Sequence, residues 1–137
     1  MTIFQPTIRT QQDLLDAWRH LIRPLGFRGR SVWMMWIGPD ARPLPQLVEI
    51  TEDGGVDIDE LRDGMTRLLQ HLDQDLRVAF LLSRPGRDGV CDDDRERARA
   101  LYDATRAADL GVEIVHLATD DDISPIPLDE IGMRRTA

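Results

Sequence analysis

The 137-residue chain contains one cysteine, no lysine and no asparagine, and only 5% of its residues are aromatic. The single cysteine, Cys91, excludes an internal disulfide and fits a reducing cytoplasm, which is the localisation that we expect. Without lysine, the chain has no Schiff-base nucleophile and no lysine for a Walker-type phosphate loop. No apolar run reaches the roughly 18 residues that a membrane span needs, and the N-terminus lacks the basic start and apolar core of a signal peptide. We therefore expect no contact with a membrane.

The charged residues are mostly acidic: 25 aspartates and glutamates stand against 17 arginines, which gives a net charge of −8 at pH 7. Because nucleic-acid-binding proteins present a basic face, this balance predicts that the chain binds no nucleic acid. Hydrophobic residues make up 42% of the chain. A chain of this length fits one domain, which buries roughly two-thirds of its unfolded surface. We expect residues 1–137 to form a single domain.

Hydrophobic periodicity predicts three helices. The first runs from Thr10 to about Arg23, and Thr10 with Asp13 has the spacing of an acidic capping box. The second runs from Asp57 to about Gln74, and the third from about Asp92 to Asp109. Apolar residues recur in each at three- and four-residue steps, so each helix has one face to bury.

Four apolar runs predict strands, because each is short and bounded by residues that favour turns. They are Ser31–Ile37, Leu44–Ile50, Leu76–Leu82 and Val112–Ala118. The first two form an antiparallel hairpin with a loop of about five residues. The last two lie parallel, joined through the third helix by a right-handed crossover. After Thr119 we expect one short strand or one helical turn. The predicted fold is an α/β (α+β) single domain with a mixed sheet, an N-terminal hairpin and a parallel β-α-β unit flanked by helices.

Three short motifs in the second half of the chain occur in an order that is known from a protein family. Leu82-Ser83-Arg84-Pro85-Gly86 ends the third strand, Asp92–Arg95 opens the third helix, and Val115-His116-Leu117 lies in the last strand. This order resembles the RadC-like branch of the JAB/MPN (JAMM) metalloprotease family. There a hairpin carries a glutamate, a buried strand ends in His-x-His-Pro-Ser-Gly, Pro-Ser-x-x-Asp opens a helix, and the next strand ends in Asp-His. Only Pro85 and His116 match as residue types, so the resemblance is one of pattern and order.

The resemblance covers most of the chain. It implies a JAB-like core over residues 28–132, preceded by a helical segment over 1–27 and followed by a tail over 133–137. The stretches 81–86 and 115–121 also resemble small actinobacterial proteins. A GC-rich genome of that kind explains why lysine and asparagine, whose codons are rich in adenine, are both absent.

The departures from the family concern its metal. The family's zinc is held by two histidines and an aspartate, and a glutamate activates the bound water. At these positions the chain has Leu82, Arg84 and Arg95, with Arg30 near the position of the glutamate. An aliphatic side chain cannot ligate, and a guanidinium cannot be deprotonated to donate a lone pair. The resemblance therefore implies a metal-free relative without a cofactor, to which protease chemistry is not carried over.

One candidate ligand site is the loop Ser83–Arg87, which leaves the C-terminal end of a buried strand. Open α/β sheets bind their ligands at this edge. Arg84 and Arg87 could hold the carboxylate or phosphate of a small anionic ligand. The alternative is that both arginines pair with Asp92–Asp94, which already satisfy the dipole of the following helix, or simply face water.

A second candidate is His116, which lies in the last strand. A lone histidine there is either a hydrogen-bonded structural residue or, with Ser83, part of an unusual hydrolase. A nucleophilic pair also needs an orienting third group and an oxyanion hole, and the spacing shows neither. The acidic runs Asp92–Asp94 and Asp120–Asp122 lack the spacing of a calcium loop, so we predict no metal site.

Trp33 and Trp36 lie in the most unusual apolar cluster of the chain. On a strand, Trp33 and Met35 face one side of the sheet, and Met34 and Trp36 face the other. If helices cover both faces, these residues belong to the core. If one face is open, a tryptophan and a methionine are exposed side by side, which suits an interaction surface for a protein partner.

We therefore hypothesise a non-catalytic protein-interaction or scaffold module with a metal-free JAB-like fold, which self-associates through the hairpin or the first helix. The alternative is a binder of a small anionic ligand, or an unusual hydrolase, that uses the Ser83–Arg87 loop and His116.

Overall fold

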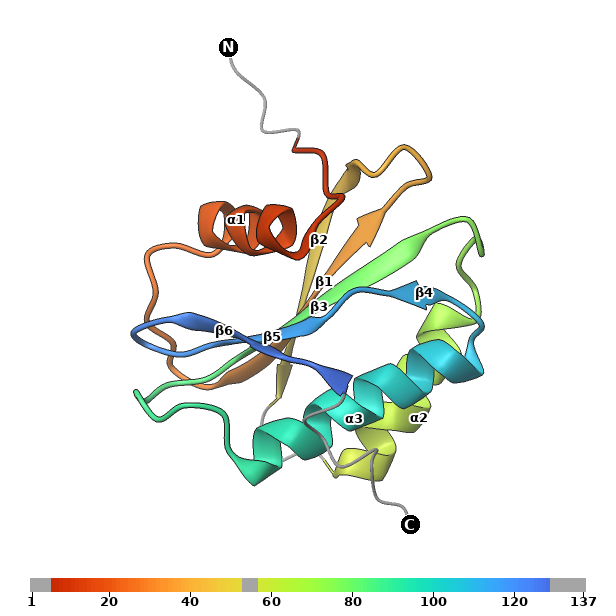
Figure 1. Ribbon diagram of the computed structural model, residues 1–137. Coiled ribbons are helices and arrows are strands. Elements are labelled where there is room, and N and C mark those ends of the chain that lie inside the picture. The colour runs from red at the N-terminus through yellow and green to blue at the C-terminus, as the bar shows by residue number, and fades with distance from the viewer. Residues whose placement is uncertain (1–5, 53–56, 129–137) are drawn as a thin grey trace.

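The computed structural model describes residues 6–52 and 57–128 of the chain. In chain order its elements are α1 (Gln11–Leu21), β1 (Arg30–Ile37), β2 (Pro43–Glu52), α2 (Ile58–Leu69), β3 (Arg77–Ser83), α3 (Asp92–Ala107), β4 (Gly111–Val112), β5 (Val115–Ala118) and β6 (Ile123–Ile126). The six strands of this part of the chain form one mixed sheet in the order β2-β1-β3-β5-β6, with β4 beside β3. Figure 1 shows this arrangement. No helix in the described ranges is both long and apolar enough to cross a membrane.

The sheet confirms the predicted fold class. β1 pairs antiparallel with β2 across a turn over residues 38–42, which is the predicted hairpin. β3 and β5 are parallel, and α3 connects them as the predicted β-α-β unit. β1 also pairs antiparallel with β3, and β6 pairs antiparallel with β5, so the sheet is mixed.

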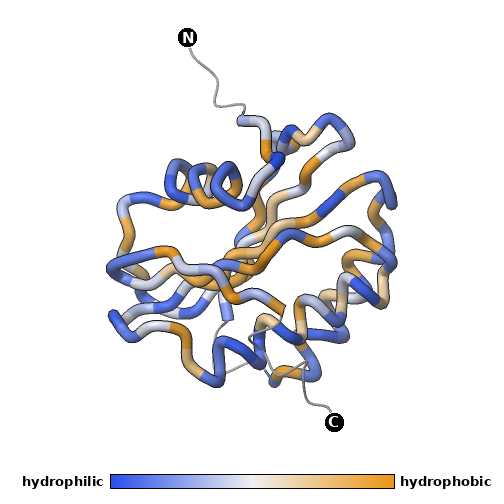
Figure 2. Tube along the Cα trace, in the orientation of Figure 1, coloured by the Kyte–Doolittle hydropathy of each residue, from blue (hydrophilic) through white to orange (hydrophobic). Residues whose placement is uncertain are grey.

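Helices cover both faces of the sheet, with α2 and α3 on one side and α1 on the other (Figure 1). Side chains alternate along β1: Met34 and Trp36 pack toward α2 and α3, whereas Met35 packs toward α1. β3 is buried on both faces, which explains its almost continuous run of apolar residues. The apolar segments accordingly meet at the centre of the molecule (Figure 2).

The predicted helix start at Thr10 is confirmed in detail. The Thr10 hydroxyl accepts a hydrogen bond from the Asp13 N–H, and the Asp13 carboxylate accepts one from the Thr10 N–H. The helix ends are earlier than predicted, at Leu21 for α1 and at Leu69 for α2. Hydrophobic periodicity predicts the buried face of a helix better than it predicts where the helix ends. Apolar residues of the following loop can also be buried, so they extend the pattern beyond the last helical turn.

The predicted strand over residues 112–118 is interrupted, and this part of the prediction is wrong. The partner register shifts by one residue between the pair Val78–Val112 and the pair Leu81–His116. One extra residue in one strand is the signature of a bulge. The short strand expected after Thr119 is β6, whereas the predicted boundary at residue 132 lies outside the described residues.

Candidate functional site: a charged cluster at the sheet edge

Polar groups gather where three strands meet the start of α3. β3 ends at Ser83, which pairs with Ser31 near the start of β1, and Arg30 pairs with Glu52 at the end of β2. Six charged side chains converge there, and we call them the charged cluster: Arg30, Glu52, Arg84, Asp93, Asp94 and Arg97.

The centre of the charged cluster is the ion pair between Arg84 and Asp94. The Nε atom of Arg84 donates to both carboxylate oxygens, at 3.1 and 3.2 Å, and Nη2 donates to Oδ2 at 2.8 Å. Nη2 also donates to the carbonyl oxygens of Asp88 and Gly89, both at 2.9 Å, and Nη1 donates to that of Pro85 at 3.5 Å. Asp94 is fully buried and Arg84 is 7% exposed. All three guanidinium nitrogens are therefore engaged within the protein.

Asp94 is placed by the first turn of α3. Cys91 is the N-cap residue, and its backbone N–H and its Sγ atom donate to Asp94 Oδ2 at 3.0 and 3.2 Å. Burial alone would raise the pKa of Asp94, but the hydrogen bonds from Arg84 and Cys91 outweigh it and hold the pKa below its ordinary value. The hydrogen bond with Asp94 in turn raises the pKa of Arg84. Both side chains are therefore charged at neutral pH.

The remaining members extend this ion pair across the edge of the sheet. Arg30 contacts Asp93 at 3.1 Å and Asp94 at 3.5 Å. Arg97 contacts Asp93 at 3.0 Å and forms a close ion pair with Glu52. Three guanidinium groups thus balance three carboxylates. Glu52, Arg84, Asp94 and Arg97 are buried. Because buried charges are tolerated only when paired, these pairs fix the end of β2, the loop after β3 and the start of α3 relative to one another.

The structure does not bring the predicted ligand-binding residues into one site. Arg84 pairs with Asp94 and the Arg87 side chain is 80% exposed, as the alternative expected, and Arg87 also pairs with Asp121 at 3.4 Å. Ser83 accepts a hydrogen bond from Trp33 Nε1 at 3.0 Å on the α1 side of the sheet. The two arginines of the loop therefore do not form a common clamp for an anion.

His116 is buried on the same α1 side as Ser83. Its Nδ1 atom bonds the carbonyl oxygen of Ile114 at 3.1 Å, and its Nε2 atom finds no partner within the described part of the chain. Burial lowers the pKa of His116, and this residue is therefore neutral at pH 7. Ser83 and His116 are both inaccessible from outside, and the Ser83 hydroxyl is already bonded. Ser83 is therefore not a nucleophile that a substrate could reach.

The two tryptophans are placed differently. Trp36 is 7% exposed and packs in the core between the sheet and α2 and α3, as the core interpretation predicts. It therefore does not contribute to an interaction surface, because a helix layer covers its face of the sheet. Trp33 is only half-buried, on the α1 side of the sheet.

The positions that the sequence resemblance matched to the metal site of the JAB/MPN family are only partly together. Arg30 and Arg84 meet at Asp94, and Leu82 is buried on the same face of the sheet as Arg84. Arg95, in contrast, pairs with Asp92 on the surface of α3. No three His, Cys, Asp or Glu side chains within residues 6–52 and 57–128 are arranged to hold a metal ion.

Sequence reasoning named Asp94 only as one of the run Asp92–Asp94, and it missed Glu52 and Arg97. A signal for Asp94 was present, since Cys91 and Asp94 have the N-cap-to-N3 spacing of a capping box. Glu52 and Arg97 lie 45 residues apart, and no local pattern connects them.

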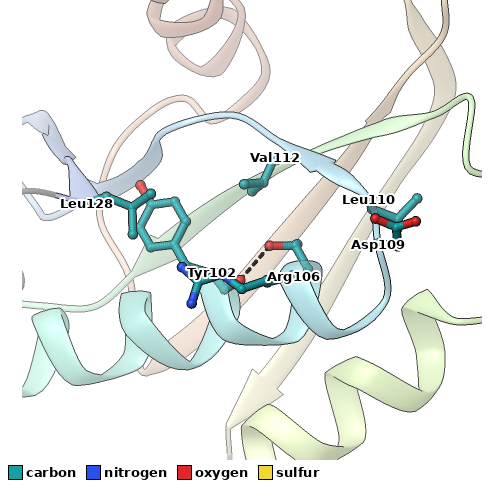
Figure 3. A pocket seen from close by; sticks show the side chains of 7 residues that line it. Tyr102, Arg106, Asp109, Leu110, Val112 and Leu128 are labelled. Atoms are coloured by element: carbon teal, nitrogen blue, oxygen red, sulfur yellow. Dashed lines mark hydrogen bonds between the residues drawn. The ribbon is translucent and has the colours of Figure 1, made fainter. Parts of the chain in front are cut away.

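A hollow of about 250 Å³ lies away from the charged cluster, beside α3 and β4 (Figure 3). It is lined by Tyr102, Thr105, Arg106, Asp109, Leu110, Val112 and Leu128. The Tyr102 hydroxyl donates to the carbonyl oxygen of Ile126 at 2.9 Å and accepts from the Val115 N–H at 2.8 Å. Burial raises the pKa of Tyr102 to about 12. Tyr102 therefore joins α3 to β5 and β6 and is not poised for acid–base chemistry.

No protein-family model matches the chain, and no curated protein is similar enough to match it.

Proposed function

We propose that this chain is a non-catalytic protein-interaction module, a metal-free relative of the JAB/MPN fold in which a buried ion pair takes the place of the metal centre. The observation that carries the proposal is the Arg84–Asp94 ion pair. It joins the loop after a buried strand to the first turn of the following helix, the two places where the family carries ligands.

The helix start supports a revised correspondence. The family motif Pro-Ser-x-x-Asp opens a helix, and here α3 opens with Cys91 as N-cap and Asp94 at N3. The same spacing thus occurs one residue before the predicted match at Asp92–Arg95. In this correspondence an aspartate, and not Arg95, stands at the position of the ligand. Arg84 stands at the second histidine of His-x-His-Pro.

An arginine at the position of a histidine ligand accounts for the balance of charge around Asp94. A guanidinium cannot donate a lone pair to a metal, but it carries positive charge into the position facing the aspartate. Its planar fork matches a carboxylate, so it neutralises Asp94 through two parallel hydrogen bonds, from Nε to Oδ1 and from Nη2 to Oδ2. A chain that keeps the aspartate and replaces a histidine by arginine retains a balanced, closed site without a metal.

The electrostatics favour a structural role over a catalytic one. A general acid or base needs a pKa near the working pH and access to a substrate. The pKa of Asp94 lies below its ordinary range and its carboxylate is fully buried. The anion-binding alternative has less support, because every nitrogen of Arg84 already donates within the protein.

Metal content tests this proposal. We expect the purified chain to hold far less than one zinc per molecule by elemental analysis, and its melting temperature to be the same with added zinc as with a chelator. Stoichiometric zinc that survives dialysis would overturn the proposal. A rise in melting temperature with phosphate or a carboxylate, lost in Arg87→Gln, would instead support the anion-binding alternative.

A further inference from the structure

The sheet is open on its α1 side along β2. Leu47, Glu49 and Thr51 alternate on this side of the strand, and all three side chains are exposed. Among the described residues, the apolar cluster that packs under α1 includes no residue of β2. Trp33 of β1 lies at the border of this cluster and is half-buried. Helix α1 therefore leaves the β2 end of this face uncovered.

An aromatic ring and a carboxylate stand next to each other on the uncovered face. Glu49 lies directly opposite Trp33 in the antiparallel pairing of β2 with β1. Side chains at directly opposite positions share a face, with their Cβ atoms about 4.5–5.5 Å apart. Hydrogen bonds hold both groups in place: Trp33 Nε1 donates to the Ser83 hydroxyl at 3.0 Å, and the Ser31 hydroxyl donates to Glu49 Oε2 at 2.8 Å.

The charge of Glu49 is not balanced by a neighbouring cation. Within residues 6–52 and 57–128, Glu49 has the hydrogen bond from Ser31 but no ion pair. Glu52, three residues further along β2, is in contrast paired with Arg97. The face of an indole ring also attracts cations, because its π-electrons are negative. A cation placed over Trp33 and beside Glu49 therefore meets two attractions at once.

We propose that these two residues, which we call the Trp33–Glu49 patch, bind an arginine side chain of another protein. This inference rests on the proposed function as an interaction module and specifies the chemistry of the partner. A guanidinium is planar and weakly hydrated, stacks on aromatic rings and offers a fork of donors to a carboxylate, whereas the ammonium of lysine is a compact and strongly hydrated point charge. The patch should therefore prefer arginine to lysine.

The charge of the whole molecule also favours a basic partner. A net charge of −8 attracts a positively charged segment and repels a second copy of the chain. Leu47, which is 36% exposed and precedes Glu49 on the same face of β2, offers apolar contact to residues beside the arginine. A basic segment of a different protein is therefore the occupant that fits both the patch and its surroundings.

The test uses short glycine peptides that carry two arginines, two lysines or two citrullines, citrulline being the neutral isostere of arginine. Binding is followed through the indole N–H signal of Trp33 in nitrogen–proton NMR spectra of the whole chain. We expect the arginine peptide to shift this signal, while the signals of the buried Trp18 and Trp36 stay in place. The citrulline peptide should bind at least about fivefold more weakly, with the lysine peptide between the two.

Two variants locate the binding site. Glu49→Gln keeps the size of the side chain and an oxygen for the Ser31 hydroxyl, but removes the charge. It should weaken binding of the arginine peptide about two- to fivefold. Glu60→Gln is the matched control, since Glu60 is exposed on α2, across the sheet, and its replacement changes the net charge equally. This control should bind the peptide as the wild type does, and circular dichroism checks that both variants are folded.

Three results would overturn the inference. Equal binding of the arginine and citrulline peptides would show that the positive charge is not recognised. An equal loss in Glu49→Gln and Glu60→Gln would show a general attraction to the acidic chain. Dimers of the wild type in sedimentation equilibrium that Glu49→Gln abolishes would assign the patch to a second copy and not to another protein. None of these results bears on the zinc content, which decides the proposed function separately.

Discussion

Replacing Arg84 by glutamine is expected to destabilise the protein strongly. The substitution leaves the Asp94 carboxylate, which is fully buried, with only the more distant Arg30 at 3.5 Å as a counter-charge, and it frees the carbonyl oxygens of Asp88 and Gly89. Breaking one side of a buried ion pair costs about 3–5 kcal/mol. For a chain of this length, that loss lowers the melting temperature by roughly 10–17 °C.

The assay is urea denaturation followed by circular dichroism, because it gives the free energy of unfolding directly. Arg87→Gln is the matched control, since its guanidinium is exposed and its loss should change stability by less than about 0.5 kcal/mol. The double variant Arg84→Gln/Asp94→Asn should be less destabilised than the sum of the two single changes. A cost below about 1 kcal/mol for Arg84→Gln, or strict additivity in the double variant, would refute the reasoning.

Two further predictions concern buried polar groups. The pKa of His116 is lowered in the folded state, so its contribution to stability is complete above its ordinary pKa of 6.5 and declines as the pH falls below that value. Denaturation series from pH 7 to about pH 5 should show this decline in the wild type and a flatter profile in His116→Gln, and identical profiles would show that burial does not affect this group. Tyr102→Phe should cost about 1–3 kcal/mol, because it leaves the Val115 N–H and the Ile126 carbonyl without a partner. An unchanged unfolding midpoint for Tyr102→Phe would mean that these groups find other partners.

Local patterns predicted most of the fold. The capping box at Thr10, the turn after Ile37 and the apolar run of β3 each act over a few residues, and each appears in the structure. The bulge between β4 and β5 was missed because both sides of it are apolar and extended. Alternation of side chains gives the faces of a strand but not its register with a neighbour.

The candidate site was less accessible to sequence reasoning. Asp92, Asp93 and Asp94 are indistinguishable by residue type, and only the phase of α3, set by its N-cap at Cys91, turns Asp94 inward. The stretch that carries the family resemblance contains Arg84, but only the structure shows that Arg84 pairs with Asp94. The contact between Glu52 and Arg97 depends on the order of the strands in the sheet, and a local sequence pattern cannot predict that order.

The proposed function implies that Arg84 stands where a JAB/MPN protein would hold a metal, and introducing metal ligands tests it most directly. The double variant Leu82→His/Arg84→His places two imidazoles on the face of the sheet from which Arg84 reaches Asp94. Together with Asp94 they make a ligand set that suits zinc with water in the fourth position. Zinc binding measured by calorimetry should reach one ion per chain in this variant and be lost when Asp94→Asn is added, while the wild type binds none. A double variant that is folded yet binds no zinc would contradict the claim.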